Sequence, residues 1–459
     1  MGHDNTAEAE LRALILAAPA GARLPSIREL AGRHGASPVT IQHLITQLEH
    51  EGLVEPKPGR GTFVSPRAEF RAGDFTWQTA ALGARTVPGE GMVELLADYS
   101  TDVISLATGY PDPTLQAVDL LTAASSRAAR RPGAWGRSPA QGSAGLRTWF
   151  AADIGGGIRP DDILVISGGQ AALSAAFRSL AGPGDPVIIE SPTYVGAIDA
   201  ARLAALSPVP VPTDHEGVRT DLLDAALRTT GAHLVYLQPH AANPTGITTS
   251  AERRREVLVL ARTHGAFVIE DDYARDLHFD GRPPAPMIHA DRDGHVIHVR
   301  SLTKSAAPSL RIAALAARGP ALRRLRNARL VDDFFVSTML QETALALVTA
   351  PGWPRHLTRL QRAIGERMEV AVTAIERESG LQLSVRPSGG LVLWVAIDDR
   401  LDDRTVVRAA HDAGVAVTPG WMSFCSEPPG TFLRLSVAGT DASTIGEGIR
   451  RLGSALRTL

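Results

Sequence analysis

The chain has 459 residues, of which 44% are hydrophobic and 21% are charged, and its formal net charge is −2. This length predicts two or three domains, and the near-zero charge excludes binding to nucleic acid or membrane through a global basic field. The single cysteine, Cys425, excludes an internal disulfide framework, and no apolar run is long enough to cross a bilayer. Because residues 1–10 are polar rather than a secretory signal, we expect a cytoplasmic protein.

Residues 1–66 have the pattern of a winged helix-turn-helix. Helices are predicted over about 5–18, from Ser26 to Gly35, and from the N-cap Ser37 to Gly52. The stretch "LVEPKPGRGTFV" then predicts two short strands around a Pro/Gly turn. Helix, tight turn, capped helix and β-wing is a plan that places its third helix in the major groove of DNA.

The stretch "LPSIRELAGRHGASPVTIQHLITQLEHEGLV" followed by "GRGTFV" resembles the DNA-binding domain of the GntR family along its whole length. The resemblance implies binding to operator DNA. It departs at Pro38 and Gln42, where the family usually has arginines that touch DNA, so the target sequence does not transfer. The DNA-contact candidates are Arg28, Ser37, Thr40, Gln42, Lys57, Arg60 and Gly61.

The charge of this region leaves an alternative open. Residues 1–66 hold six Lys or Arg and seven Asp or Glu, whereas DNA-binding modules are usually basic. Phosphate contacts must therefore come from a local cluster of Arg28, Arg33, Lys57 and Arg60. The alternative is a winged helix used for protein contacts.

From about residue 101 onward, short β-branched runs alternate with helical stretches. Residues 67–100 mix polar residues with Gly and Pro and predict a linker that docks on the domain after it. The runs "DILVIS", "DPVIIE", "AHLVYL", "AFVIEDD" and "HVIHVRS" are separated by predicted helices such as 170–181, 220–229 and 250–264. This is the pattern of an α/β fold with a mostly parallel sheet. We predict a large part over about 140–330 and a smaller α+β part over about 335–459.

Lysine is almost absent from the chain, so the positions of the few lysines are informative. Only Lys57 and Lys304 are lysines among the 47 lysines and arginines. Arginine cannot be deprotonated at ordinary pH, whereas a lysine in the right surroundings acts as an amine nucleophile. Chance also leaves a few lysines in an arginine-rich chain, so the neighbours of Lys304 must decide.

Polar and aromatic residues follow the predicted strands, where α/β sheets bind ligands. In chain order they are Gly168, Gly169, Gln170, Tyr194, Asn243, Asp271, Tyr273, Ser301, Thr303, Lys304 and Arg311. Each has an ordinary structural explanation when it is taken alone. Together they suit a single ligand that combines an aldehyde, a flat ring, a basic ring nitrogen, a phenolic oxygen and a phosphate.

That ligand is pyridoxal 5′-phosphate, whose protein partners include a Schiff-base lysine and an acid beside the pyridinium nitrogen. We assign Lys304 to the aldehyde, Tyr194 to the ring face, Asn243 and Tyr273 to the phenolic oxygen, and Asp271 to the ring nitrogen. Its neighbours Glu270 and Asp272 stay open as alternatives for that acid. The phosphate candidates are the helix start at Gly168, Gly169 and Gln170, together with Ser301 and Arg311, and Thr303 is a further cofactor-binding candidate. We predict no metal site.

The motifs "NPTG", "EDDY" and "SLTKSAAPSLR" resemble the aspartate-aminotransferase-like family of pyridoxal-phosphate proteins over roughly 105–459. The resemblance implies that Arg434 in "TFLRLSVAG" grips a substrate α-carboxylate. It departs at "WGRSPAQG", where Arg137 stands at the position of a family tyrosine that reaches the partner subunit's cofactor phosphate.

A GntR-like winged helix followed by an aminotransferase-like domain resembles the MocR subfamily of bacterial transcription regulators. The resemblance implies a homodimer that binds pyridoxal phosphate and operator DNA and responds to the cofactor or to an amino compound. The alternative is an active aminotransferase with a vestigial DNA-binding domain, which the retained Asn243 and Arg434 favour. A pyridoxal-phosphate carrier or structural protein is a third, weaker possibility.

Overall fold

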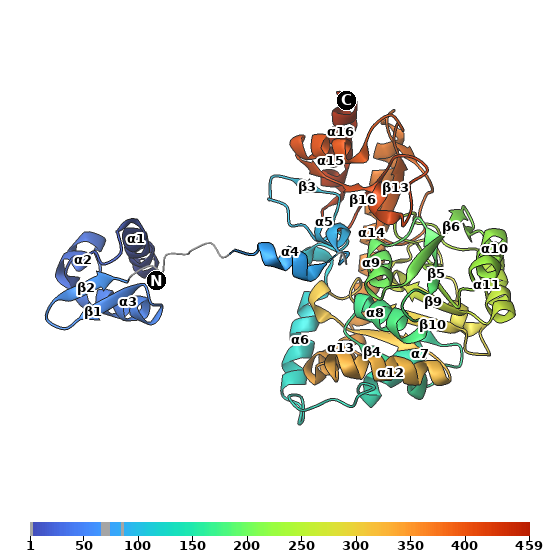
Figure 1. Ribbon diagram of the computed structural model, residues 1–459, viewed down its shortest axis with the longest axis horizontal. Helices are drawn as coiled ribbons and strands as arrows, with labels where there is room; N and C mark the ends of the chain where they lie inside the picture. The colour runs from blue at the N-terminus through green and yellow to red at the C-terminus, as the bar shows by residue number, and fades with distance from the viewer. Residues whose placement is uncertain (1–2, 66–73, 84–86) are drawn as a thin grey trace. The chain divides into compact units, whose positions relative to one another are not determined.

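The structure, a computed structural model, describes residues 3–65, 74–83 and 87–459. The chain divides into two compact units, Met1–Thr86 and Val87–Leu459 (Figure 1). Each unit has its own apolar core. In the described part of the chain, no helix is long and apolar enough to cross a membrane.

The first unit contains the predicted winged helix-turn-helix. Its elements are α1 (His3–Ala17), α2 (Ile27–His34), α3 (Pro38–His50), β1 (Val54–Lys57) and β2 (Gly61–Val64). The two strands pair antiparallel, with Val54 opposite Val64. One apolar cluster holds the unit together, because Leu11, Leu30 and Ile41 from the three helices are completely buried.

Side-chain caps determine where α2 and α3 begin. The hydroxyl of Ser26 accepts from the Glu29 amide at 3.3 Å, and the Glu29 carboxylate accepts from the Ser26 amide at 2.7 Å. This reciprocal capping box satisfies two amides that a helix start otherwise leaves unpaired. The Ser37 hydroxyl caps α3 without a reciprocal bond to its own amide, accepting from the Thr40 amide at 3.0 Å.

The region predicted as a linker contains two short helices, α4 (Thr76–Leu82) and α5 (Glu90–Leu95). Helix α4 falls in the first unit, whereas α5 falls in the second and packs against α9 (Val195–Leu203). The Gly91 backbone is buried in this contact. The second half of the predicted linker is therefore part of the folded second unit.

An eight-stranded sheet forms the centre of the second unit. Its strands are β4 (Ile163–Ile166), β5 (Pro186–Ser191), β6 (Ser207–Asp214), β7 (Gly217–Val218), β8 (Leu234–Leu237), β9 (Phe267–Asp272), β10 (Val296–Ser301) and β11 (Ala313–Ala316). The order is β4-β11-β10-β9-β8-β5-β6-β7, and the five strands from β10 to β6 run parallel. The predicted α/β class with a mostly parallel sheet is confirmed.

Helices cover both faces of this sheet, as its fully buried central strands require. The helices are α6 (Val118–Ala129), α7 (Ala144–Ile154), α8 (Gly169–Leu180), α9, α10 (Thr220–Thr230), α11 (Ala251–His264), α12 (Pro320–Asp333) and α13 (Thr338–Val348). Helices α8, α9 and α12 share one core with the side chains of one face, and the others share a second core on the opposite face.

A smaller α+β part completes the second unit. It comprises α14 (Trp353–Glu376), α15 (Asp403–Asp412), α16 (Ala442–Leu456), a sheet of β12 (Gln382–Leu383), β13 (Val392–Ala396), β16 (Phe432–Ser436) and β15 (Thr418–Pro419), and a pair of β14 (Val415–Ala416) with β3 (Ile104–Ser105). The core of this part includes Leu106 and Leu115, whereas Ala344 and Leu347 of α13 pack in the large core. The chain thus enters the small part before it forms the large sheet.

We predict that the capping box sets the stability of α2. Replacing Ser26→Ala removes the acceptor for the Glu29 amide and should cost about 1 kcal/mol of local stability. Ser26→Asn keeps a capping oxygen and should cost a few tenths of that value. Native-state hydrogen exchange of the α2 amides in the full chain measures both; equal protection in the two variants would show that the cap contributes nothing.

Candidate functional site

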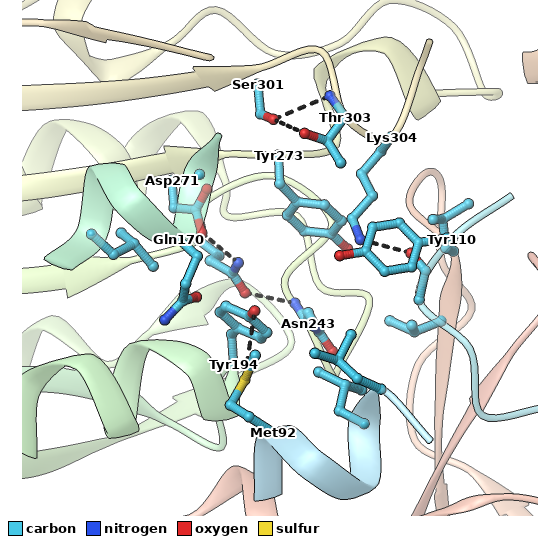
Figure 2. Close-up of a pocket in the computed structure, with 18 of the residues that line it drawn as sticks. Met92, Tyr110, Gln170, Tyr194, Asn243, Asp271, Tyr273, Ser301, Thr303 and Lys304 are labelled. Carbon is cyan, nitrogen blue, oxygen red and sulfur yellow. Dashed lines mark hydrogen bonds between the residues drawn. The ribbon is translucent and has the colours of Figure 1, made fainter. Parts of the chain in front are cut away.

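The candidate site is a cavity of about 310 Å³ at the carboxyl ends of the parallel strands, between the large and small parts of the second unit (Figure 2). The predicted site residues that line it are Gly169, Gln170, Tyr194, Asn243, Asp271, Tyr273, Ser301, Thr303, Lys304, Arg311 and Arg434. Gly168 is outside the lining, at the N-cap of α8. Residues spread over more than 260 positions of the sequence from Gly169 to Arg434 therefore meet in one cavity.

The Lys304 amine lies inside the cavity with neutral partners. Its Nζ donates to the Gly109 carbonyl at 2.8 Å and lies 3.6 Å from the centroid of the Tyr110 ring. Burial, reinforced by the positive charges of Arg434 and Arg311, lowers the pKa of Lys304 to about 7. A large fraction of this amine is unprotonated near neutral pH, which is the state that reacts with an aldehyde.

Strand alternation separates the three consecutive acids of β9. Asp271 lines the cavity, whereas Glu270 and Asp272 do not. The Glu270 carboxylate accepts from the Met287 amide at 2.6 Å, and Asp272 lies 3.3 Å from Nδ1 of His240. Only Asp271 is therefore placed to contact a ligand in this cavity.

The Asp271 carboxylate is held by two side-chain donors. Tyr236 and Gln238 both donate to its Oδ2 at 2.9 Å. Burial raises the pKa of Asp271, while these two hydrogen bonds act in the opposite direction. No hydrogen bond to Oδ1 occurs within the described ranges, so this oxygen is available to a cationic or N–H group of a ligand.

A second group of residues forms a cradle at the start of α8. Gly168 has φ +93°, and a Cβ there would lie 2.5 Å from Nη2 of Arg311. Glycine is thus required for this guanidinium to approach the helix start. Ser301 Oγ lies 3.1 Å from Thr303 Oγ1 beside it. Amides at a helix start, hydroxyls and an arginine are the groups that bind a phosphate.

Arg434 enters the cavity from β16 of the small part. Its Nε donates to Asn243 Oδ1 at 2.9 Å, and its Nη1 donates to the Ala107 carbonyl at 2.9 Å. Burial lowers the pKa of Arg434 to about 10, and no carboxylate pairs with it among the described residues. A buried guanidinium with neutral partners favours a ligand that brings a carboxylate.

The two tyrosines have different partners. The Tyr273 hydroxyl donates to the Ala241 carbonyl at 2.8 Å, and the Tyr194 hydroxyl lies 3.9 Å from the Met92 sulfur (Figure 2). Burial raises the pKa of both hydroxyls, which keeps them protonated as donors. Tyr194 stands at the N-cap position of α9 without a side-chain capping bond, and it lines the cavity.

The sequence-based reasoning missed several lining residues. They are Met92, Leu95, Leu96, Gly109, Tyr110, Leu173, Gln238, Leu391 and Val392. Three of them come from α5 and the residue after it, within the predicted linker. Gly109 and Tyr110 follow β3, which pairs in the small part, so no strand-end rule for the large sheet marks them. The one feature of the sequence that could have marked Gly109 and Tyr110 as lining residues is the aromatic residue next to a glycine in "TGYP".

The remaining predicted residues lie elsewhere. Arg137 is exposed and does not line the cavity. In the first unit, Ser37 and Thr40 are at the start of α3, Gln42 is on its exposed side, and Lys57, Arg60 and Gly61 are at the wing. No metal-binding group of three His, Cys, Asp or Glu residues occurs in the part of the chain that the structure describes.

Comparison with known proteins places both units. Residues 101–452 match the family described as aminotransferase class I and II. The chain belongs to this family. Residues 4–64 match the gntR family of bacterial regulatory proteins. A gntR-type unit joined to an aminotransferase unit is the organisation of MocR regulators.

The individual relatives include both enzymes and regulators. A 2-aminoadipate transaminase of Thermus thermophilus is 33% identical over 84% of this chain and 98% of its own length. The probable rhizopine catabolism regulatory protein MocR of Rhizobium meliloti is 28% identical over 98% of this chain and 93% of its own length. The crystal structure of an α-aminoadipate aminotransferase of Thermus thermophilus, complexed with N-(5′-phosphopyridoxyl)-L-leucine, matches with a TM-score of 0.74 at 31% identity over 81% of this chain and 97% of its own.

The cofactor of this chain is pyridoxal 5′-phosphate, and the cavity fits it. Gln170 Oε1 is buried without a partner among the described residues, and the cradle at Gly168 leaves no room for a Cβ. An amine of lowered pKa, one unpaired carboxylate oxygen and an arginine beside a helix start are the donor set that this cofactor needs.

We predict a pH signature of the buried amine in the cofactor-free protein. The unfolded chain keeps a proton on Lys304 up to its ordinary pKa near 10.5, whereas the folded chain loses it near pH 7. Between these values the unfolded state binds more protons, so wild-type stability rises with pH relative to Lys304→Met. Thermal unfolding of both proteins at pH 7 and pH 9.5 measures this. A constant difference between the two melting temperatures would show that the amine is not buried.

Proposed function

We propose that this chain is a transcriptional regulator that binds operator DNA as a homodimer and responds to an amino compound through its pyridoxal-phosphate cavity. The observation that carries the proposal is the combination of a winged helix with a cavity in which Lys304 and Arg434 both lack a carboxylate partner among the described residues. Such a cavity suits a ligand with an amine and a carboxylate. The operator DNA would place its action in the cytoplasm.

Each cavity residue has a separate task in this proposal. When bound, pyridoxal phosphate supplies an aldehyde that reacts reversibly with primary amines. Lys304 would present its amine to that aldehyde, and Asp271 would hold a proton on the ring nitrogen. Tyr194 would cover the ring, and Asn243 and Tyr273 would donate to the phenolic oxygen, Tyr273 by turning its hydroxyl away from the Ala241 carbonyl. The phosphate would be held by Gly168, Gly169, Gln170, Ser301, Thr303 and Arg311.

Arg434 would bind the carboxylate of the incoming amino compound. Its position on the small part and its bond to Asn243 beyond β8 place it between the two parts of the unit. A ligand carboxylate there would favour the arrangement in which the two parts are close. A ligand shifts such an equilibrium only by its difference in affinity for the two states.

An active aminotransferase is the second candidate, favoured by specific residues. Lys304, Asn243 and Arg434 are all present, and one relative is named as a transaminase. Turnover requires Lys304 to accept and return a proton after the amino compound has displaced it. A regulator needs only the displacement, so the two candidates differ in the steps after binding.

The homodimer proposal follows from the family resemblance and draws on three exposed apolar side chains. Trp135, Val331 and Phe334 are exposed by 80%, 86% and 73%. Their segments are joined because Arg329 donates to the carbonyls of Ala140 and Phe334. Exposed apolar side chains are candidates for burial against a partner subunit if they form a contiguous patch. We place Arg137, exposed on the same segment, toward the partner's cavity.

The first test concerns the cofactor. Wild-type protein with added pyridoxal phosphate should absorb at wavelengths longer than those of protein aromatic groups, and borohydride should fix the cofactor to Lys304. Lys304→Ala should fold and lose the fixation. Asp271→Ala should weaken cofactor binding, whereas Asp272→Asn should affect it less, because Asp272 lies outside the cavity. A colourless wild type that borohydride does not label would remove the cofactor assignment.

The second test concerns DNA. Arg28 and Arg60 are exposed and make no ion pair within residues 3–65, so they are available to phosphates. Removing one arginine–phosphate contact should reduce the slope of log affinity against log salt by about 0.9. Arg28→Ala and Arg60→Ala should show this in operator binding at several salt concentrations. Arg12→Ala is the control, because Arg12 is already paired with Glu8 and Glu51. Unchanged slopes in both variants would indicate a winged helix that serves protein contacts.

The third test separates regulator from enzyme. We expect an amino compound, or the cofactor itself, to change operator affinity severalfold, and transamination with common keto acids to be slow or absent. Operator binding and product analysis over a panel of amino acids measure both. Turnover at ordinary enzyme rates of ~1–10³ per second, together with operator binding indifferent to ligand and cofactor, would establish the aminotransferase instead.

A further inference from the structure

Helix α5 lies between the two parts of the second unit, at the wall of the cavity. A Cβ on Gly91 would lie 2.7 Å from Val195 of the large part and 3.3 Å from the Met422 methyl group of the small part. The helix is thus in contact with both parts at one residue. Figure 2 shows Met92 projecting from this helix toward Tyr194.

The α5 side of the cavity is apolar. Met92, Leu95 and Leu96 line it from α5 and its C-terminal end, and Leu391 and Val392 line it from the small part. Glu94 does not line the cavity; Arg404 and Asp403 of the small part are its charged neighbours. This wall therefore offers a ligand hydrocarbon and sulfur atoms.

Every charged side chain that lines the cavity already has a role in the proposed function. Among the described residues, the charged side chains in the lining are Asp271, Lys304, Arg311 and Arg434. The first three serve the cofactor and the fourth serves a carboxylate in the proposed function. Within this described lining, no charged side chain remains for a second carboxylate or a second ammonium on the ligand. Burying such a group without a partner is costly.

We infer that the cavity selects α-amino acids with an apolar side chain, and that Met92 and Leu95 of α5 determine this selection by contacting that side chain. The inference rests on the proposed function, since it requires the cofactor in the cavity and the α-carboxylate on Arg434. It goes further by naming the class of ligand and the element that distinguishes it. One methylene in an apolar pocket changes affinity by about 10- to 200-fold.

The test titrates cofactor-loaded full-length protein with L-leucine, L-alanine, L-aspartate and L-lysine, following the change in cofactor absorbance. Wild type should bind leucine at least about tenfold more tightly than alanine, and more tightly than aspartate and lysine. Tighter binding of aspartate or lysine would overturn the inference while leaving the proposed function in place. A protein that acquires no cofactor absorbance would instead refute the proposed function itself.

Variants of α5 test whether this helix determines the selection. Met92→Ala and Leu95→Ala should each lower the preference for leucine over alanine severalfold, with cofactor affinity and the affinity for alanine little changed. Leu95→Arg should raise the affinity for aspartate relative to leucine. Val93→Ala is the matched control, because Val93 is on the same helix, is 75% exposed and does not line the cavity. An unchanged leucine-to-alanine ratio in both alanine variants, or an equal loss in Val93→Ala, would overturn the role of α5.

Discussion

The second unit depends on holding one primary amine of lowered pKa inside a cavity that also contains two guanidinium groups. Lys304 is accommodated because burial, reinforced by Arg434 and Arg311, lowers its pKa, and because its Nζ contacts a carbonyl and an aromatic ring rather than a carboxylate. Asp271 is close enough to oppose this shift, yet its Oδ2 is occupied by Tyr236 and Gln238. The arrangement leaves the amine reactive and the carboxylate reserved for a ligand.

The residues of the cavity were predictable from sequence to the extent that they follow strands. Parallel strands end at one edge of a sheet, so the residues after β5, β8 and β10 had to come together. The choice among Glu270, Asp271 and Asp272 needed the strand's facing, because alternation alone puts Glu270 and Asp272 on one side but does not say which side is the cavity. The helix α5 was not predictable as a wall, because its apolar residues resemble those of any docked segment.

The small part of the second unit and the first unit show two further limits of prediction from the sequence. Ala344 and Leu347 follow the last strand of the large sheet, yet they pack in its core because α13 lies against α6. A local sequence pattern does not predict that a helix after the last strand packs back into the core of the large part. In the first unit, net charge does not tell which charged side chains are already paired with each other. Two of its acids, Glu8 and Glu51, are held by Arg12.

The scarcity of lysine has a practical consequence. The Lys57 side chain is 46% exposed on the wing, 3.5 Å from Glu55, whereas Lys304 lies in the cavity. An amine-directed fluorophore too large for the cavity has one lysine, Lys57, to react with among the 459 residues. The natural chain thus carries its own attachment point for a dye at the tip of the winged helix, and fluorescence anisotropy can follow that unit without any engineered cysteine.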